Sequence, residues 1–409
     1  YYVLPGGTGR EIFSLHVHYP IFTYMTKLSN LEVKRYSRHL VLSEFGLENQ
    51  LKLKRASVVV IGAGGLGSPA LLYLAAAGVG NLGIIDFDSV EISNLQRQII
   101  FSMDDLGRNK AEAAAAKLSK LNPLVEIHTY PTRISSSNAL TLLEKYDVVI
   151  DGTDNFPTRY LLNDACMLLG KPLIYGSILR FEGQVAVFNL SNGHGGYSTN
   201  YRDLFPNPPD PGSVQNCEEA GVIGVLPGMI GTMQANEAIK IITGLGEPLS
   251  DKLLLLDALG MEFTTIKIRP QTVRAAIHEL IDYEDFCGIS DGKNKSLVLN
   301  ERVTMKEITV RELKELKDSG ADFQLIDVRE PHEYDICNLE GELIPQGEIP
   351  GNVDKIDRSK KVILQCRSGA RSGNMVQWLE KNHGFENLYN LKGGILAWAR
   401  EIDPSMPTY

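Results

Sequence analysis

The chain has 409 residues, which is enough for more than one domain. Hydrophobic residues make up 43% and charged residues 22%, an ordinary composition for a soluble globular protein. The formal net charge of -9 argues against nucleic acid or an anionic membrane as the main partner. No apolar run is long enough to cross a bilayer, so we expect no membrane anchor.

Residues 1–24 differ from the rest, because they are aromatic and loop-like and the first methionine is Met25. We expect residues 1–29 to be an N-terminal extension that is non-native or disordered. A targeting peptide and a strand that pairs elsewhere remain open. The next segment, Glu32 to Leu42, mixes basic and apolar residues at helical spacing, and Arg38 in it is interpreted as part of a solvated helix face.

A glycine cluster is the most informative local pattern. An apolar run from Val58 to Ile61 leads into G-x-G-x-x-G at Gly62, Gly64 and Gly67, and Asp86 ends a second apolar run about twenty residues later. Glycines let backbone N–H groups meet phosphate at a helix N-terminus, and a carboxylate at a strand end can accept a ribose hydroxyl. The pattern predicts an adenosine-containing ligand, and it leaves open an NAD enzyme or a turn without ligand.

Two basic residues follow this unit. The polar segment Ser93 to Gln98 comes directly after the Asp86 strand end, and Arg97 within it suits a phosphate clamp. Lys110 opens an alanine-rich helix that ends before Pro123. These positions favour a ligand with several phosphates.

A further buried strand ends in the carboxylates of Asp151 and Asp154. Pocket residues of doubly wound sheets lie at such carboxyl ends. Asp154 is a candidate Mg²⁺ ligand, since magnesium favours few carboxylates together with phosphate oxygens. A turn or a helix cap is the alternative for a single aspartate at this position.

The chain has five cysteines, and none forms a C-x-x-C pair. This number and spacing argue against a disulfide framework and against a cysteine-only zinc site. Cys217 lies near the end of a long loop rich in glycine, proline and asparagine, just before a helix start that can lower the pKa of a thiol. An inert small apolar residue is the commoner fate of a cysteine and remains open for Cys217.

Strands alternate with helices again after a polar stretch, which predicts a second α/β domain at 303–409. Its strand from Lys361 ends at Cys366, which enters the basic, glycine-containing loop Arg367 to Ser372. A cysteine between a strand and a helix start faces N–H groups and a positive dipole end, which stabilise a thiolate or a persulfide anion. We expect Arg367 and Arg371 to add charge there, and such a loop to give the thiol no apolar packing.

These motifs together, in this order, resemble the molybdopterin-synthase adenylyltransferase (MoeB/ThiF) family, the bacterial relatives of ubiquitin-activating enzymes. The resemblance covers Leu31 to Gly288, and the block around Cys366 resembles rhodanese sulfurtransferases. It implies a Rossmann-like doubly wound adenylation domain at 30–288, a linker at 289–302, and a smaller α/β rhodanese domain at 303–409. The Cys287-Gly288 and Asp403-Pro404 segments look closest to cyanobacterial or plastid members, so we expect a cytoplasmic protein, or a stromal one if the source is an alga.

The resemblance also implies the roles of individual residues. ATP with Mg²⁺ would be bound, Asp86 would hold the ribose, Asp154 would hold the metal and Asn155 would line the pocket. Arg97 would reach in from the second subunit of a homodimer and Arg38 from its own chain. The full set implied for the nucleotide is Gly62, Gly64, Gly65, Gly67, Asp86, Ser93, Asn94, Leu95, Gln96, Arg97, Lys110, Asp154, Asn155 and Arg38; the catalytic set is Cys366, Cys217, Arg97 and Asp154.

The implied reaction is adenylation of the C-terminal Gly-Gly carboxylate of a ubiquitin-like sulfur carrier, followed by sulfur transfer from a Cys366 persulfide to give a thiocarboxylate. The molybdopterin synthase small subunit is the expected carrier, and a thiamine or tRNA-thiolation carrier is the alternative. Thiosulfate or a cysteine desulfurase would donate sulfur, and Cys217 matches the acyl-linking cysteine of the family. Many relatives bind zinc through two C-x-x-C pairs, but Gly195 to Tyr201 and Pro270 to Arg274 contain no cysteine, so we expect no zinc.

Overall fold

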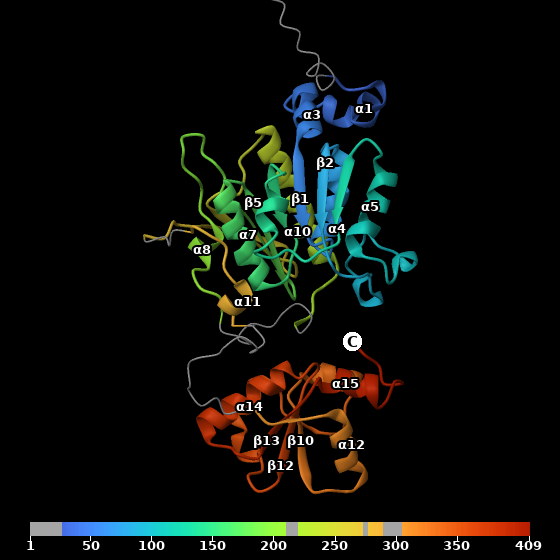
Figure 1. The fold of residues 1–409 in the computed structure, drawn as a ribbon, viewed down its shortest axis with the longest axis vertical. Helices are drawn as coiled ribbons and strands as arrows, with labels where there is room; N and C mark the ends of the chain where they lie inside the picture. Colours follow the sequence, from blue (N-terminus) through green and yellow to red (C-terminus); the bar gives the residue numbers. More distant parts are fainter. Residues whose placement is uncertain (1–26, 210–219, 273–276, 289–304) are drawn as a thin grey trace, which may run out of the picture.

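The computed structural model describes residues 27–209, 220–272, 277–288 and 305–409. Figure 1 shows two α/β domains, a larger one built before residue 288 and a smaller one built after residue 305. Nearly all of the expected extension, the whole expected linker and Cys217 lie outside the described residues. No helix among the described residues is long and apolar enough to cross a membrane.

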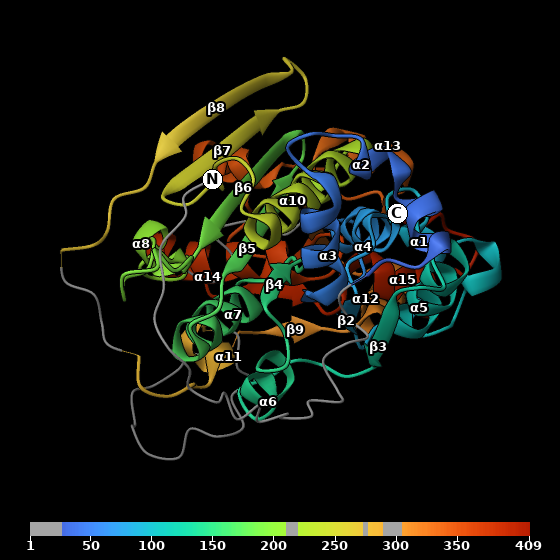
Figure 2. The same ribbon diagram turned by 90° about the horizontal axis from the view of Figure 1, so that it is seen from above.

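The larger domain is built on an eight-stranded sheet with the order β3-β2-β1-β4-β5-β6-β7-β8. β1 to β5 pair in parallel, and β6, β7 and β8 are added antiparallel, which places β8 at the edge of the sheet in Figure 2. The strands are β1 (Ser57–Ile61), β2 (Asn81–Ile85), β3 (Glu126–Tyr130), β4 (Val148–Asp151), β5 (Leu173–Leu179), β6 (Glu182–Phe188), β7 (Lys252–Asp257) and β8 (Glu262–Lys267).

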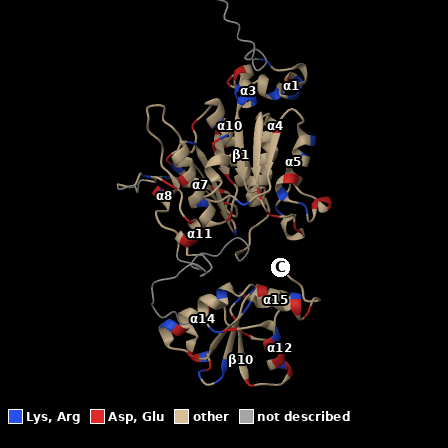
Figure 3. Ribbon diagram, in the orientation of Figure 1, with Lys and Arg blue, Asp and Glu red and all other residues tan. Residues whose placement is uncertain are grey.

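Helices cover both faces of this sheet because alternate side chains of each strand point to opposite sides. In β1, Val58 and Val60 join one apolar cluster with α3, α4, α5 and α10, whereas Val59 and Ile61 join another with α6 and α7. The helices are α1 (Asn30–Arg35), α2 (Ser37–Leu40), α3 (Gly46–Arg55), α4 (Gly67–Ala77), η1 (Ile92–Asn94), η2 (Met103–Asp105), α5 (Lys110–Leu121), α6 (Ala139–Leu143), α7 (Phe156–Leu169), α8 (Tyr201–Leu204), α10 (Val225–Thr243) and α11 (Tyr283–Phe286). The central strands carry few charges in Figure 3, as burial on both faces requires.

The smaller domain has a five-stranded parallel sheet with the order β11-β10-β12-β13-β9. Its strands are β9 (Glu307–Ile308), β10 (Phe323–Asp327), β11 (Glu342–Leu343), β12 (Lys361–Gln365) and β13 (Leu388–Leu391). Its helices are α12 (Val310–Asp318), α13 (Pro331–Ile336), η3 (Gln346–Gly351), η4 (Val353–Lys355), α14 (Ala370–His383) and α15 (Gly394–Glu401), with α14 on one face and α12 and α15 on the other. The predicted α/β class of both domains is confirmed.

Candidate active sites

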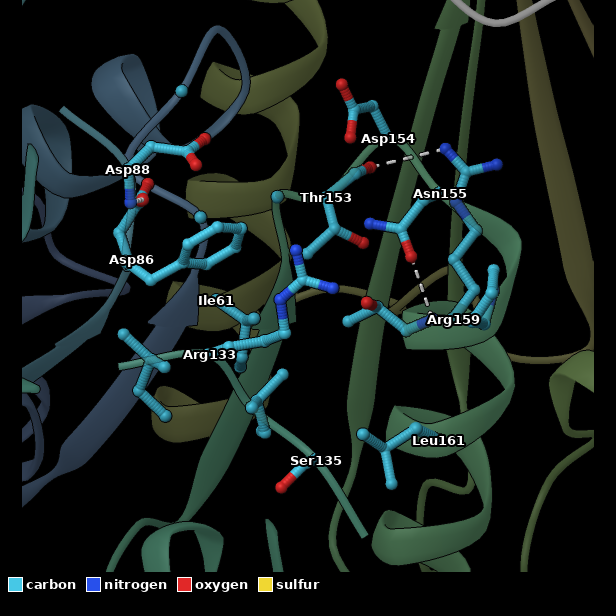
Figure 4. Close-up of a pocket in the computed structure, with 18 of the residues that line it drawn as sticks. Ile61, Asp86, Asp88, Arg133, Ser135, Thr153, Asp154, Asn155, Arg159 and Leu161 are labelled. Atoms are coloured by element: carbon cyan, nitrogen blue, oxygen red, sulfur yellow. Dashed lines mark hydrogen bonds between the residues drawn. The ribbon is translucent and has the colours of Figure 1, made fainter. Parts of the chain in front are cut away.

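A cavity of about 930 Å³ opens at the carboxyl ends of the parallel strands in the larger domain. It lies beside β1, whose neighbours in the sheet are β2 on one side and β4 on the other. The strand order changes direction at this point, and doubly wound sheets bind ligands there. In Figure 4, Asp86 and Asp88 form one wall, Thr153, Asp154 and Asn155 form the facing wall, and Arg133 lies between them. The strand-end carboxylates predicted from the sequence therefore converge.

The glycine loop between β1 and α4 forms the floor of this cavity through Gly62, Gly64 and Gly65. Gly62 has φ of +87°, a left-handed conformation that other residues rarely adopt. Gly67 does not line the cavity, and it is needed for packing, because a Cβ there would lie 1.9 Å from the main-chain oxygen of Gly62. The loop therefore brings main-chain N–H groups close to a ligand at the start of α4.

Asp86 is buried where β2 ends, and its two oxygens accept main-chain hydrogen bonds. Ala63 N–H donates to Oδ2 at 2.8 Å and Asp88 N–H donates to Oδ1 at 2.9 Å. Burial raises the pKa of Asp86 above that of an ordinary aspartate, although these donors and Lys110 act in the opposite direction. Each oxygen keeps a further lone pair, so the carboxylate can still accept a ribose hydroxyl.

We expect acid to weaken nucleotide binding through Asp86. Protonation removes the charged acceptor, and because its pKa is raised the loss begins above the ordinary value of 3.8. Asp86→Asn is expected to bind ATP roughly 10- to 100-fold more weakly and to lose this pH dependence. Titration of a fluorescent ATP analogue across a pH series tests this, with the thermal melt as a control for folding. An unchanged pH dependence in Asp86→Asn would contradict the assignment.

Lys110 and Arg97 are the two predicted cations that line this cavity of their own chain. Lys110 begins α5, is buried, and donates from Nζ to Asp88 Oδ2 at 3.1 Å. A Cβ at Gly65 would lie 3.7 Å from Arg97 Cγ, so Arg97 is adjacent to its own glycine loop. In this structure Arg97 therefore lines the cavity of its own chain, and its entry into the cavity of a second subunit stays a prediction.

Ser93, Asn94, Leu95 and Gln96 do not line the cavity, contrary to expectation. Asn94 is buried and its Oδ1 accepts the N–H of Glu91 at 3.1 Å, which caps η1. Ser93 supplies the main-chain oxygen that accepts Arg97 Nη1 at 3.0 Å. These residues lie in the turn that presents Arg97, and local hydrogen bonds of Ser93 and Asn94 hold that turn.

Arg38 also lies outside the cavity. It is exposed on α2, which packs with α1 and α3, and α3 leads directly into the amino end of β1. Figure 1 shows α1 and α3 at the end of the sheet where β1 begins, whereas the cavity lies where it ends. In this structure Arg38 therefore does not reach the cavity of its own chain, and its contact with phosphates stays a prediction.

The segment after β4 supplies the wall with Asp154. Asp151 is fully buried, and its Oδ1 accepts hydrogen bonds from the N–H and the hydroxyl of Thr153 at 2.9 and 2.6 Å. Burial raises the pKa of Asp151. Asn155 caps α7 by accepting Thr158 N–H at 3.0 Å, so it both lines the cavity and starts the helix. These bonds hold Asp154 exposed over the cavity.

Asp154 fits the requirements of a magnesium ligand bound together with phosphates. Its carboxylate is exposed in the cavity and makes no hydrogen bond or ion pair with another described residue. Mg²⁺ commonly uses one or two carboxylates and takes its remaining ligands from phosphates and water. No cluster of three or more potential metal ligands occurs among the described residues, and none is needed for such a site.

Several cavity residues escaped the sequence reasoning. Arg133 follows β3 and stacks over the Phe87 ring, with Cζ 4.4 Å from the centroid, and its Nη1 lies 3.2 Å from Glu284 Oε1. Residues that follow the carboxyl end of a parallel strand tend to line the pocket, and this reasoning, which identified Asp86, applies to Arg133 as well. No local signal marks Glu284, because the packing of α11 on α7 brings residues 280–284 to the cavity.

The second predicted site is the loop between β12 and α14, where Cys366 is fully buried. Cys366 Sγ accepts the N–H of Gly369 at 3.1 Å. The Ser372 hydroxyl lies 3.4 Å from the sulfur, but its single proton has a closer acceptor in Asn390 Oδ1 at 2.7 Å. Gly369 has φ of +93°, which turns its N–H toward the sulfur. The Gly369 N–H, at the start of a helix, stabilises negative charge on that atom.

One expectation about this loop is wrong. Cys366 packs in the apolar cluster under α14, so the basic loop does give it apolar contacts. The two arginines bind other partners near the loop: Arg371 pairs with Glu333 at 2.6 Å, and Arg367 donates to the main-chain oxygen of Tyr409 at 2.6 Å. Their side chains therefore order the surroundings of the loop, and the main-chain N–H of Gly369 is the donor that acts on the sulfur.

The structure has a nucleotide-binding type of α/β domain followed by a domain with a cysteine loop. Known protein families show the same two parts. Residues 36–275 match the model of the ThiF family, and residues 309–401 match that of the rhodanese-like domain. The chain belongs to the ThiF family, with a rhodanese-like domain after the family domain.

Relatives along nearly the whole chain share this arrangement. The "Probable adenylyltransferase/sulfurtransferase MoeZ" of Mycobacterium tuberculosis is 46% identical over 393 residues, covering 95% of this chain and 98% of its own. The "Adenylyltransferase and sulfurtransferase MOCS3" of Aedes aegypti is 42% identical over 402 residues, covering 94% and 91%. The chain is therefore an enzyme that combines adenylyltransferase and sulfurtransferase activities.

Solved structures support the fold of the larger domain. Escherichia coli MccB, solved with MccA-N7isoASN, has a TM-score of 0.52 and 23% identity, covering 58% of this chain and 73% of its own. PaaA has a TM-score of 0.51 and 23% identity, covering 61% and 77%. At this identity the likeness concerns the fold alone.

Proposed function

We propose that the larger domain uses ATP to adenylate the C-terminal Gly-Gly carboxylate of a ubiquitin-like sulfur carrier, and that the smaller domain then converts this carboxylate to a thiocarboxylate. The observation that carries the proposal is the meeting of the glycine loop, Asp86, Lys110, Arg97 and Asp154 in one cavity. A nicotinamide enzyme would need the glycine loop and Asp86, but it would not need a magnesium carboxylate or the cysteine loop.

In the adenylation step the protein acts by positioning and by neutralising charge. Asp86 accepts a ribose hydroxyl, and the N–H groups of the glycine loop meet the phosphates. Lys110 and Arg97 offset the negative charge that accumulates when a carrier carboxylate oxygen attacks the α-phosphorus and pyrophosphate leaves. Asp154 would hold Mg²⁺, which supplies charge neutralisation for the leaving pyrophosphate.

In the sulfur step Cys366 accepts a sulfane sulfur from thiosulfate or from the persulfide of a cysteine desulfurase. The terminal sulfur attacks the carbonyl of the acyl-adenylate and AMP leaves, so the acyl group is joined to Cys366 through two sulfurs. A second thiol then attacks the Cys366 sulfur, which releases the thiocarboxylate and forms a disulfide that a small-molecule thiol reductant reopens. Cys217, which lies outside the described residues, is our candidate for that thiol.

The carrier that we propose is the molybdopterin synthase small subunit, with a thiamine or tRNA-thiolation carrier as the alternative. Incubation of that subunit with the enzyme, Mg²⁺, ATP and thiosulfate is expected to raise its intact mass by the difference between sulfur and oxygen. Pyrophosphate without a mass change would show that the donor is wrong. If neither the mass gain nor pyrophosphate is observed, the proposed carrier is wrong. If no Gly-Gly carrier gives pyrophosphate, the adenylation reaction itself is contradicted.

We also propose that the enzyme is a homodimer. A second cavity of about 730 Å³ lies beside Arg97, and it is lined by Ile99, Ile223, Val225, Met229 and Met233. Ile99 and Val225 are each more than half exposed, and apolar surface of this kind marks an interface. Sedimentation of a monomer at micromolar concentration would contradict the proposal.

The free thiols favour a reducing compartment, so we place the enzyme in the cytoplasm or, for an alga, in the plastid stroma.

We expect the purified enzyme to contain no stoichiometric zinc, and a chelator to leave its melting temperature unchanged. Where many relatives carry cysteine pairs, Asp203 accepts the N–H groups of Asn200 at 2.9 Å and Gln271 at 2.8 Å. Nearby, Arg202 pairs with Asp164 at 2.7 Å. The bond between Gln271 and Asp203 joins the two segments that zinc would join. One zinc per chain by metal analysis, or a melt lowered by chelator, would contradict this expectation.

A further inference from the structure

Tyr409 lies beside the Cys366 loop and contacts three charged side chains of the smaller domain. Its hydroxyl accepts a hydrogen bond from Arg329 Nη1 at 2.6 Å and donates one to Glu333 Oε1 at 3.1 Å. Its main-chain oxygen accepts a hydrogen bond from Arg367 Nε at 2.6 Å. The ring centroid is 5.9 Å from Arg329 Cζ and 5.7 Å from Arg367 Cζ, within the range of a cation–π contact.

Arg329 gives Tyr409 a fixed support. It is fully buried, and its Nε and Nη2 donate to both oxygens of Asp327 at 2.5 to 3.1 Å. Nη2 also donates to the main-chain oxygen of Cys337 at 2.8 Å. A planar guanidinium held in this way has little freedom, so the Tyr409 hydroxyl is anchored to the core of the domain.

Glu333 connects Tyr409 to the first turn of α14. Arg371 donates from Nη1 and Nη2 to the two oxygens of Glu333 at 2.7 and 2.6 Å, and both side chains are buried. Burial opposes the charged form of Glu333, but hydrogen bonds, above all those from Arg371, outweigh it and hold the pKa below its ordinary value. The pair is therefore ionised at neutral pH, and the position of Glu333 determines the position of Arg371.

Arg367 and Arg371 are the two ends of the segment 367–371, which leads from Cys366 into the first turn of α14. Arg367 is bound to Tyr409 directly, and Arg371 is bound to it through Glu333. Between them lies Gly369, whose N–H donates to Cys366 Sγ. We propose that Tyr409 is a positioning residue for sulfur transfer, because it holds both ends of this segment and thereby aims the Gly369 donor at the sulfur. The inference rests on the proposed sulfur-transfer function of Cys366.

Tyr409→Phe separates this role from a general effect on folding. The ring and the main-chain oxygen remain, Arg329 keeps Asp327, and Glu333 keeps Arg371. Only the two hydroxyl hydrogen bonds are lost. Burial raises the pKa of Tyr409 to about 12, so the hydroxyl that is removed is neutral and no charge is lost with it.

We expect Tyr409→Phe to lower kcat for sulfur transfer roughly tenfold and Tyr409→Ala about 100-fold, because small misplacements of a reacting group cost this much. The KM for thiosulfate is expected to stay near that of wild type, since the proposed role of Tyr409 is to position the Cys366 loop. Loss of kcat without a change in KM is a result that simple unfolding of a fraction of the protein would also give, so folding is measured alongside.

The experiment uses the full chain with thiosulfate and cyanide, in which the Cys366 thiolate takes the sulfane sulfur, sulfite leaves, and cyanide removes the sulfur as thiocyanate. Tyr334→Phe is the matched control, because Tyr334 is also in the smaller domain, next to Glu333 on α13, and its hydroxyl donates to Gly341 O at 3.0 Å. Cys366 is titrated with an alkylating agent at several pH values to give its pKa in each variant, together with melting temperature and ATP–pyrophosphate exchange.

A lowered kcat and a raised thiol pKa in Tyr409→Phe, both absent from Tyr334→Phe, would support the proposal, since misaimed donors stabilise the thiolate less well. Wild-type kcat and thiol pKa in Tyr409→Phe would overturn it, as would an equal loss in Tyr334→Phe that follows the melting temperature. An inactive wild type with normal pyrophosphate exchange would instead contradict sulfur transfer from thiosulfate at Cys366, and the inference would fall with it.

Discussion

Cys366→Ala is expected to lower sulfur transfer from thiosulfate roughly 1,000-fold or more, to background, while ATP–pyrophosphate exchange continues at the wild-type rate. The sulfur of Cys366 is the atom at which the Gly369 N–H of the loop is directed, so alanine removes the acceptor of the sulfane sulfur itself. Among the residues that the structure describes, none from the smaller domain lines the nucleotide cavity, which is why we expect adenylation to be independent.

Cys337→Ala is the matched control for this variant. Cys337 is buried in the other apolar cluster of the same domain, and only its main-chain oxygen takes part in the network around Arg329. Removing one buried sulfur costs about 1 kcal/mol in either variant, so the two should melt alike. Thiocyanate formation by Cys366→Ala, or loss of pyrophosphate exchange in a folded Cys366→Ala protein, would contradict the division of labour.

Asp154→Ala is expected to lower ATP–pyrophosphate exchange about 100- to 1,000-fold, and to raise the Mg²⁺ concentration needed for half-maximal exchange. The carboxylate is exposed in the cavity and bonds to no other described residue, so its loss should not affect folding. Exchange measured over a magnesium series separates the metal role from a general loss of activity.

Asp104→Ala serves as the comparison, because Asp104 is an exposed aspartate on η2 that does not line the cavity. It should match wild type in both exchange rate and magnesium dependence. Sulfur transfer from thiosulfate should be normal in both variants and reports an intact smaller domain. An Asp154→Ala enzyme with normal exchange and normal magnesium dependence would remove Asp154 from the mechanism.

The parts of the site that could be predicted are those in which one short segment does the chemical work. Gly62 and Asp86 belong to one strand–loop–helix–strand unit, and Asp154 directly follows a buried strand. Carboxyl ends of parallel strands meet at one edge of a sheet, so their residues converge once the strands are identified. Cys366 was predictable for the same reason, since a strand end and a helix start enclose it.

The arginines show where this reasoning fails. Arg97 and Arg38 both follow recognisable patterns, but a pattern does not say at which end of the sheet a segment packs. α2 lies at the amino end of β1, so Arg38 is far from the cavity, whereas η1 lies next to Gly65 and places Arg97 within it. The charges of Arg367 and Arg371 were likewise expected at the sulfur, but Glu333 and Tyr409 bind them elsewhere.

The amino-acid sequence by itself determined the two α/β domains, their order, the glycine loop and the cysteine loop, because local periodicity, glycine conformation and strand-end chemistry act within a few residues. Only the tertiary structure decided which cations face the nucleotide, that residues 280–284 close its cavity, and that Tyr409 and Glu333 hold the Cys366 loop. Those contacts join segments far apart in the chain, and the packing of helices on the sheets, which no local pattern encodes, brings them together.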